Sequence, residues 1–318
     1  MPPDIDQNEK EKWDNYYVRQ TLVPADPEVE AFYRELALAM LAFLPPGGRV
    51  LEAGCGSGMH SLALAREGSC QVSLIDFSSE AIGYARKVFA AAKAQASFEV
   101  GDVFAAAGNA DQDLVFNSGV LEHYEFDRQV AFLKGMACRS RRYVFVMVPN
   151  RECYWYWVWR IRSAASGQWP FGYEKPADDY RAAIEAAGLH YLGRAYFGAA
   201  VVKRHLAALE GLSPPLRQLI EQVHDREVVS AAQRSYLVGF LAAVAPGEER
   251  PRGFALGTDD RAYLDSDRVD RYITLLGDSL AGQIAAENRL AAAEARQRAL
   301  EAENLALRQS LEQRQPKT

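Results

Sequence analysis

The sequence has few cysteines and no cluster of metal-ligating residues. Its 318 residues contain only Cys55, Cys70, Cys138 and Cys153, which lie far apart and form no C-x-x-C pair. This spacing argues against a zinc ribbon and against a disulfide scaffold. We expect no metal site and a reduced protein.

Long hydrophobic runs and an excess of basic charge are also missing. The longest runs, 143–149 and 236–245, fall short of the ~20 residues that a membrane-spanning helix needs. The polar, acidic N-terminus lacks the hydrophobic core of a secretion signal. Lys and Arg number 36 against 42 Asp and Glu, a net charge of −6, so no basic surface for nucleic acid is predicted. We therefore expect a cytoplasmic protein with no membrane span and no nucleic-acid partner.

Hydrophobic segments alternate with helical ones through most of the chain. Hydrophobic residues make up 49% of the sequence, enough for a globular core. Strands this apolar are buried on both faces, and alternation with helices indicates parallel strands joined by right-handed crossovers. We predict an α/β fold with a doubly wound, mostly parallel, seven-stranded Rossmann-like sheet, in which the last strand is an antiparallel partner. The predicted strands cover residues 49–52, 71–76, 98–100, 113–117, 143–148, 189–197 and 236–244.

Helices, an aromatic segment and a linker are predicted around these strands. Residues 1–44 are predicted to form a helical cap, and residues 120–137 a single helix after the fourth strand. Residues 151–176 are aromatic and irregular in pattern. A Pro- and Gly-rich stretch marks a linker near the C-terminus. The predicted division is a domain at 1–245, a linker at 246–258 and a helical tail at 259–318.

The tail repeats hydrophobic and small residues every seven positions. Position a falls on Leu290, Gln297, Asn304 and Leu311, and position d on Ala286, Ala293, Leu300 and Leu307. This pattern predicts a short C-terminal coiled coil, and an Asn at a favours a parallel two-stranded register. We expect a homodimer through this segment. A single solvated helix is the alternative, because alanine at d makes a weak contact.

A glycine-rich loop, Glu52-Ala53-Gly54-Cys55-Gly56-Ser57-Gly58, follows the first predicted strand and opens a helix. Glycines allow a sharp turn and close approach of a ligand, and the helix N-terminus offers free N–H groups. Ligands of doubly wound sheets bind at this end of the strands. A dinucleotide fingerprint would need glycine where Met59 stands, and Glu52 disfavours a pyrophosphate. A nicotinamide-dependent oxidoreductase is therefore disfavoured.

The E-x-G-x-G-x-G pattern, with acidic residues after the next two strands, resembles class I S-adenosylmethionine-dependent methyltransferases from about Trp13 to Val244. The resemblance implies S-adenosyl-L-methionine as cofactor, with S-adenosyl-L-homocysteine as the product. It implies that the loop cradles the methionine and ribose parts, that Asp76 accepts hydrogen bonds from the ribose hydroxyls, and that Asp102 reads the adenine. The implied cofactor-binding residues are Glu52, Gly54, Gly56, Gly58, Asp76, Phe77, Asp102, Val103, Asn117 and Tyr17.

His123 and Glu122 follow the fourth predicted strand, which in similar enzymes ends beneath the reacting methyl group. A hydroxyl acceptor needs a general base, and imidazole titrates near neutral pH. His123 is therefore the candidate base, unless it only orders the loop. Glu122 either orients His123 or stabilises the first turn of a helix through the helix dipole.

The acceptor is less specified by the sequence than the cofactor. The aromatic run Cys153–Arg160 suits sugars, aromatic molecules and cations alike, although an amphipathic helix that packs on the sheet also explains it. Trp13, Tyr16 and Tyr17 either close over the cofactor or pack as part of the core. We expect methyl transfer to an O or N atom of a small-molecule or glycan-type acceptor. The alternative is a catalytically silent, cofactor-binding scaffold that acts through its coiled coil.

Overall fold

The computed structural model describes residues 7–22, 26–105, 108–165, 167, 169, 171–172, 174–202, 214–225, 230–251 and 289–302. The chain divides into two compact units. The first spans residues 1–209 and 230–262, and the second spans 210–229 and 263–318. The sheet and its flanking helices belong to the first unit.

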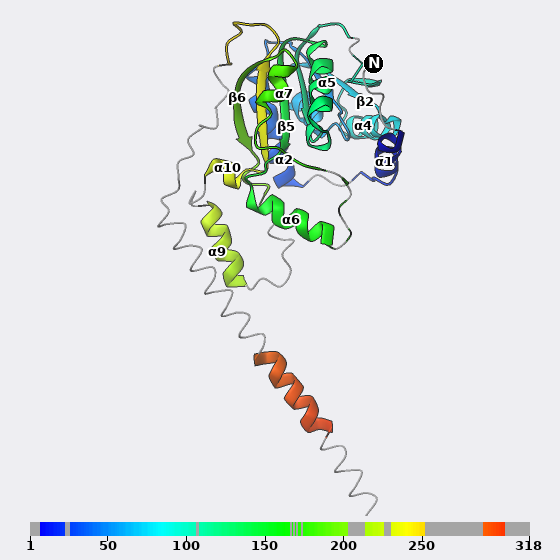
Figure 1. Cartoon of the computed structure of the whole chain (residues 1–318). Coiled ribbons are helices and arrows are strands. Elements are labelled where there is room, and N and C mark those ends of the chain that lie inside the picture. The colour runs from blue at the N-terminus through cyan, green and yellow to red at the C-terminus, as the bar shows by residue number, and fades with distance from the viewer. Residues whose placement is uncertain are drawn as a thin grey trace, which may run out of the picture. The chain divides into compact units, whose positions relative to one another are not determined.

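The first unit is built on one seven-stranded sheet (Figure 1). Its strands are β1 (Arg49–Ala53), β2 (Gln71–Asp76), β3 (Ser97–Val100), β4 (Gln112–Ser118), β5 (Ser140–Pro149), β6 (His190–Phe197) and β7 (Leu237–Ala243). The spatial order is β3-β2-β1-β4-β5-β7-β6. The pairs from β3 to β5 are parallel, and β7 runs antiparallel to both β5 and β6. The predicted mostly parallel sheet with a late antiparallel strand is confirmed.

Helices cover both faces of the sheet. The helices of the first unit are α1 (Gln7–Val18), α2 (Pro27–Leu41), α3 (Met59–Glu67), α4 (Ser79–Ala91), α5 (Phe126–Ala137), α6 (Tyr154–Ala165), α7 (Arg181–Ala186) and α10 (Ala231–Arg234). Side chains of α2, α3 and α4 pack on one face, and those of α5 and α7 on the other. Because strand side chains alternate in direction, Leu114 and Phe116 of β4 join the first core, while Val115 joins the second.

Two predictions from the sequence were wrong in detail. Residues 120–137 do not form one helix, because a 3₁₀ turn, η1 (Leu121–His123), precedes α5 and ends at Tyr124. The N–H groups of His123 and Tyr124 bond to the carbonyls of Val120 and Leu121, three residues back, which closes a tighter turn than an α-helix. The aromatic segment predicted as irregular contains α6, a helix of 12 residues, so the alternative interpretation of the run 153–160 as a helix is the one that agrees with the structure.

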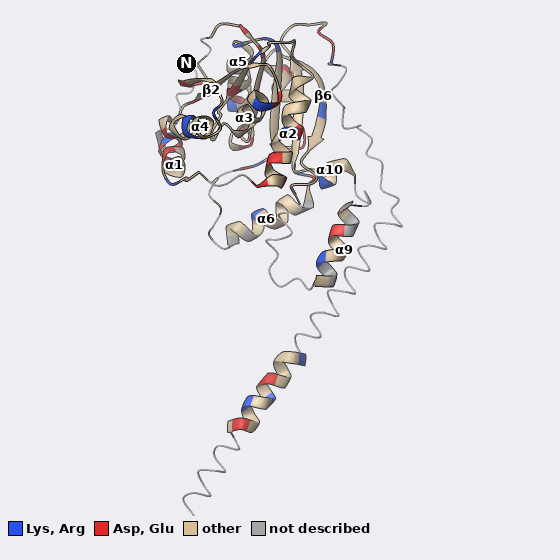
Figure 2. Cartoon of the chain, turned by 180° about the vertical axis from the view of Figure 1, so that it is seen from behind, with Lys and Arg blue, Asp and Glu red and all other residues tan. Residues whose placement is uncertain are grey.

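The second unit contains α9 (Pro214–Asp225) and a helix over residues 289–302. Figure 2 shows that the latter helix carries both acidic and basic side chains. Leu290 and Leu300, at predicted positions a and d, are 62% and 52% exposed. The heptads beyond this helix lie outside the described residues, so the coiled coil stays a prediction.

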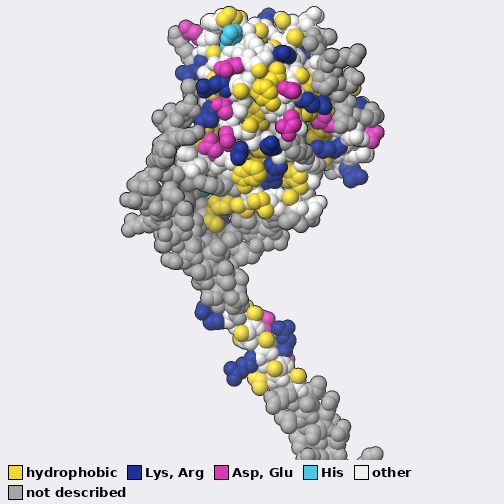
Figure 3. Space-filling model, viewed as in Figure 1, with side chains coloured by type: hydrophobic (Ala, Val, Ile, Leu, Met, Phe, Trp, Pro, Cys, Tyr) yellow, Lys and Arg dark blue, Asp and Glu magenta, His cyan; other side chains and the backbone are white. Residues whose placement is uncertain are grey.

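The charges on the surface are mixed. On the face drawn in Figure 3, basic and acidic side chains alternate around hydrophobic ones. In the part of the chain that the structure describes, no helix is both long and hydrophobic enough to cross a membrane.

Candidate functional site

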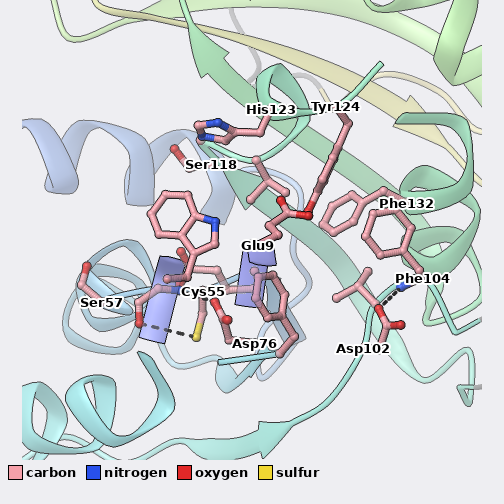
Figure 4. Close-up of a pocket in the computed structure, with 18 of the residues that line it drawn as sticks. Glu9, Cys55, Ser57, Asp76, Asp102, Phe104, Ser118, His123, Tyr124 and Phe132 are labelled. Atoms are coloured by element: carbon pink, nitrogen blue, oxygen red, sulfur yellow. Dashed lines mark hydrogen bonds between the residues drawn. The ribbon is translucent and has the colours of Figure 1, made fainter. Parts of the chain in front are cut away.

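A pocket opens at the carboxyl ends of β1, β2 and β4, where the glycine-rich loop turns into α3 (Figure 4). It holds about 820 Å³ of space between protein atoms, part of it open to solvent. We call it the first pocket. Helix α1 supplies part of its wall through Glu9, Trp13 and Tyr17. The sheet supplies the predicted residues Glu52, Gly54, Gly56, Asp76, Phe77, Asp102 and Val103.

The three glycines of the loop differ in what surrounds them. All have positive φ angles, +69° at Gly54, +50° at Gly56 and +70° at Gly58, which favour glycine. A Cβ atom on Gly56 would lie 2.1 Å from the hydroxyl oxygen of Tyr17. A Cβ atom on Gly58 would lie 2.6 Å from Cδ2 of Leu74 in the core. Gly54 and Gly56 therefore face the first pocket, whereas Gly58 faces the core and lies outside the pocket lining.

Asp76 ends β2 and binds the loop directly. Its Oδ2 accepts a hydrogen bond from the backbone N–H of Gly56, and its Oδ1 accepts one from that of Ser78, both at 2.9 Å. Burial raises the pKa of Asp76 to about 6, although these two N–H groups favour the charged form. Each carboxylate oxygen has a second lone pair, so Asp76 can still accept hydrogen bonds from a ligand hydroxyl.

Glu52 ends β1 as a buried carboxylate beneath the loop. Gly58, the N-cap of α3, has no side chain to cap the helix. Oε2 of Glu52 accepts a hydrogen bond from the N–H of Ser61 at 3.2 Å and so satisfies one free donor of the first turn. Its Oε1 lies 3.4 Å from Nδ1 of His60. Glu52 thus holds the start of α3 and the His60 ring in place.

The first pocket has an acidic lining. Glu9, Glu52, Asp76 and Asp102 line it, and none of its described lining residues is Lys or Arg. One of the four has a cationic neighbour, since Glu9 lies 3.7 Å from Arg128. A site of this composition attracts a cation and repels the phosphates of a dinucleotide.

Asp102 and His123 mark opposite ends of the first pocket (Figure 4). Oδ1 of Asp102 accepts a hydrogen bond from the N–H of Phe104 at 2.8 Å, which orients the carboxylate after β3. His123 lies beside Ser118 at the other end, with its ring 5.6 Å from that of Trp13. An elongated ligand can therefore contact both ends.

Asn117 of β4 lies outside the lining of the first pocket. Its side chain is fully buried, and neither its Nδ2 nor its Oδ1 has a hydrogen-bond partner among the described residues. On the sheet it pairs with Val146 of β5. The structure thus separates Asn117 from the other predicted cofactor-binding residues that line the pocket.

A second pocket adjoins the first and shares part of its wall. Both are lined by Trp13, Tyr17, His60, Ser118, Gly119 and His123. The second pocket also contains the carboxyl groups of Glu122 and Glu174. The other aromatic residues that line it are Phe32, Tyr33, Tyr156, Trp159, Trp169, Phe171 and Tyr236. Of the predicted catalytic pair, His123 lines both pockets and Glu122 lines the second.

Sequence reasoning missed two residues of this region. From the sequence His60 is interpreted as structural or solvated, because no acidic or cysteine residue converges on it. In the structure it lines both pockets, and its Nε2 is buried without a partner among the described residues. Its place two residues after the last loop glycine is a signal that could have identified it. Glu174 was also missed, and no pattern in its segment points to the pocket.

A model of a known protein family matches the chain in this region. Residues 50–141 match the family model described as "Methyltransferase domain". The matched segment runs from β1 into β5 and includes the glycine-rich loop, Asp76, Asp102 and His123. No curated protein is significantly similar to this chain.

Two solved structures illustrate the similarity to known folds. Magnesium protoporphyrin IX methyltransferase from Synechocystis PCC 6803, with bound S-adenosylhomocysteine, is 17% identical, with 74% of this chain and 94% of that chain covered and a TM-score of 0.46. Geranyl diphosphate C-methyltransferase from Streptomyces coelicolor A3(2) is 10% identical, with 76% and 100% covered and a TM-score of 0.49.

Proposed function

We propose that this chain is an S-adenosyl-L-methionine-dependent methyltransferase that acts on an O or N atom of a small-molecule or glycan-type acceptor. The observation that carries the proposal is the acidic first pocket, which lies at the carboxyl ends of the strands within the segment matching a methyltransferase domain. The adjoining second pocket supports it, because a transferase needs separate sites for donor and acceptor that meet at the reacting atoms.

The residues of the first pocket fit this cofactor. When bound, S-adenosylmethionine supplies an electrophilic methyl group on a positively charged sulfonium. Acidic side chains suit that charge and the ammonium of the methionine part. Asp76 would hold the ribose hydroxyls, and Asp102 and Val103 would hold the adenine. Gly54 and Gly56 would contact the methionine part of the cofactor near the sulfonium. Gly58 and Asn117 would act from outside the lining, by fixing the loop and the strand end.

The residues around both pockets exclude water and supply bases. Trp13 and Tyr17 of α1 cover the region where the pockets meet, and removal of water strengthens electrostatic interactions there. His123 and His60 both reach this region. The carboxylate of Glu52 favours a proton on Nδ1 of His60, which leaves the lone pair of Nε2 free to accept a proton from an acceptor group.

Calorimetric titration with S-adenosylhomocysteine tests this proposal, with NAD as the matched control. We expect saturable binding of the homocysteine nucleoside and none of NAD. Asp76→Ala should weaken binding, whereas Asp178→Ala should not, because Asp178 is exposed and pairs only with exposed Arg151 among the described residues. Binding of NAD alone, or of neither ligand, would refute the assignment.

We further infer that the tail mediates self-association. The described helix over 289–302 exposes Leu290 and Leu300, and both lie on the predicted seam. Exposed leucines at heptad spacing favour pairing with a second copy. This role is compatible with catalysis and also with the silent-scaffold alternative.

A further inference from the structure

The second pocket combines aromatic walls with buried carboxyl groups. Its aromatic side chains come from α1, α2, α6, the segment after α6 and the start of β7. Aromatic ring faces carry partial negative charge and attract cations. The two carboxyl groups, on Glu122 and Glu174, are 1% and 6% exposed. Ring faces and carboxylates share a preference for positive charge.

Glu122 has an unused oxygen in this pocket. Its Oε2 is buried and has no hydrogen-bond partner among the described residues. A buried polar atom without a partner is costly, and a ligand that donates a hydrogen bond would remove that cost. Oε1 of Glu122 lies 3.6 Å from the position that a Cβ atom on Gly119 would occupy. Gly119 lines both pockets, so the carboxyl group lies near their shared wall.

Glu174 has partners of its own. Its Oε1 accepts a hydrogen bond from the hydroxyl of Tyr156, which also accepts one from Nη1 of Arg160 at 3.3 Å. Nη2 of Arg160 donates to the backbone carbonyl of Glu174, and the guanidinium stacks on Trp157 and Trp169. Arg160 is therefore engaged with Glu174 and its neighbours.

No comparable partner reaches Glu122. Among the described residues, no Lys or Arg lies within ion-pair distance of its carboxyl group. Burial and the nearby charge of Glu174 raise the pKa of Glu122 well above its usual range, and Arg160 opposes this only in part. Tyr180 and Tyr236 also interact with Glu122, and their raised pKa values keep both neutral near pH 7. His60 and His123 are titratable groups that line the same pocket.

We propose that the second pocket binds an amine, a basic nitrogen attached to an aromatic or aliphatic group, as the acceptor for methyl transfer. The inference rests on the proposed function, since it names the acceptor class of the same site. An ammonium group offers positive charge to the rings and a hydrogen bond to Oε2 of Glu122. A neutral hydroxyl offers a hydrogen bond without charge. A sugar would need many more polar partners than the aromatic walls provide.

Proton release follows from this arrangement. Burial and the nearby Glu174 raise the pKa of Glu122, which favours its protonated form in the empty pocket, whereas a free amine near pH 6 is an ammonium ion. The two form an ion pair only if the Glu122 carboxyl gives its proton to solvent, so we expect a proton to leave as an amine binds. Transfer of a further proton from the ammonium to the candidate base His123, which lines the same pocket, would free the nitrogen lone pair for methylation.

Calorimetry with matched amine and alcohol probes tests the proposal. Wild-type protein saturated with S-adenosylhomocysteine would be titrated at pH 6 with 2-phenylethylamine, 3-phenylpropylamine and cyclohexylmethylamine, each beside its alcohol analogue. Two buffers of different ionisation enthalpy report the protons released. We expect at least one amine to bind at least about tenfold more tightly than its alcohol, because charge-assisted hydrogen bonds are the stronger ones. We expect about one proton released per amine and none per alcohol.

Glu122→Gln removes the ionisable group while keeping the shape. It should abolish the proton release and reduce the amine preference, while the aromatic rings and Glu174 of the same pocket still favour a cation. The amide matches the carboxyl in size, and unchanged S-adenosylhomocysteine affinity would verify that the variant folds. Glu152→Gln, on the exposed turn before α6, is the control and should behave as wild type. Proton release is measured on the wild-type protein, so this part of the test does not depend on whether a variant folds.

The outcomes separate the two proposals. If S-adenosylhomocysteine does not bind, the proposed function fails. If it binds but no amine is preferred over its alcohol, or if Glu122→Gln retains both the full preference and the proton release, only this inference is overturned.

Discussion

Replacing Gly58 with alanine should destabilise the first unit far more than the same change at Gly47. Both residues have φ near +70°, where an L-residue costs ~1–2 kcal/mol, partly offset by ~0.4–1 kcal/mol from a less flexible unfolded chain. A Cβ on Gly47 would have nothing within 4 Å, whereas one on Gly58 would meet Leu74 at 2.6 Å, Ala85 at 3.3 Å and Phe89 at 3.4 Å. Overpacking of this kind adds ~1–3 kcal/mol.

The free energy of unfolding should therefore fall by about 1 kcal/mol in Gly47→Ala and about 3 kcal/mol in Gly58→Ala. Urea titration followed by tryptophan fluorescence measures it, since all five tryptophans lie in the first unit. If the free energy of unfolding falls with urea concentration at the same slope in both variants, their unfolded states are comparable. Equal losses of stability would refute the conclusion that Gly58 is required by the core.

Two further predictions concern the cofactor and the tail. Ribose hydroxyls that donate hydrogen bonds to Asp76 need its ionised form, and the pKa of Asp76 in the empty pocket is about 6. The affinity for S-adenosylhomocysteine should therefore be constant above pH 6 and fall about tenfold per pH unit below it. An unchanged affinity at pH 5, or the same decline in Asp76→Asn, would contradict the contact. Deleting residues 276–318 should yield a smaller species in sedimentation velocity with unchanged S-adenosylhomocysteine affinity, and an unchanged sedimentation coefficient (after correction for the lost mass) would exclude self-association through the tail.

The sheet could be predicted because each strand is a short hydrophobic segment between turn residues. The sequence also shows which strand residues are buried. At 143–148, for example, every residue is apolar and every side chain is buried. The turn before α5 could not be predicted in the same way. Residues 120–137 carry a helical pattern throughout, but the local bonds of His123 and Tyr124 close a 3₁₀ turn instead. Such a choice depends on tertiary packing rather than on propensity.

The first pocket was largely predictable, and the second was not. Acidic residues that follow parallel strands must meet at one edge of the sheet, so Glu52, Asp76 and Asp102 could be grouped before any coordinates. The second pocket joins side chains as distant in sequence as Tyr33, Glu174 and Tyr236. Their proximity is fixed by how α2, α6 and β7 pack, which no spacing along the chain records.

The role of Glu122 follows from its place in the sequence together with its surroundings in the structure. Its position before a helix favours the interpretation that it stabilises the helix dipole, and that role would leave the carboxylate near solvent. The 3₁₀ turn instead buries the side chain in an aromatic pocket, where an unpaired carboxyl lowers stability by roughly 1–3 kcal/mol. An apolar side chain of similar size would fill the same space without that cost. A hydrogen-bond donor in the pocket offsets the cost, and a positively charged donor also pairs with the ionised carboxylate, which is why a bound amine accounts for the residue better than packing does.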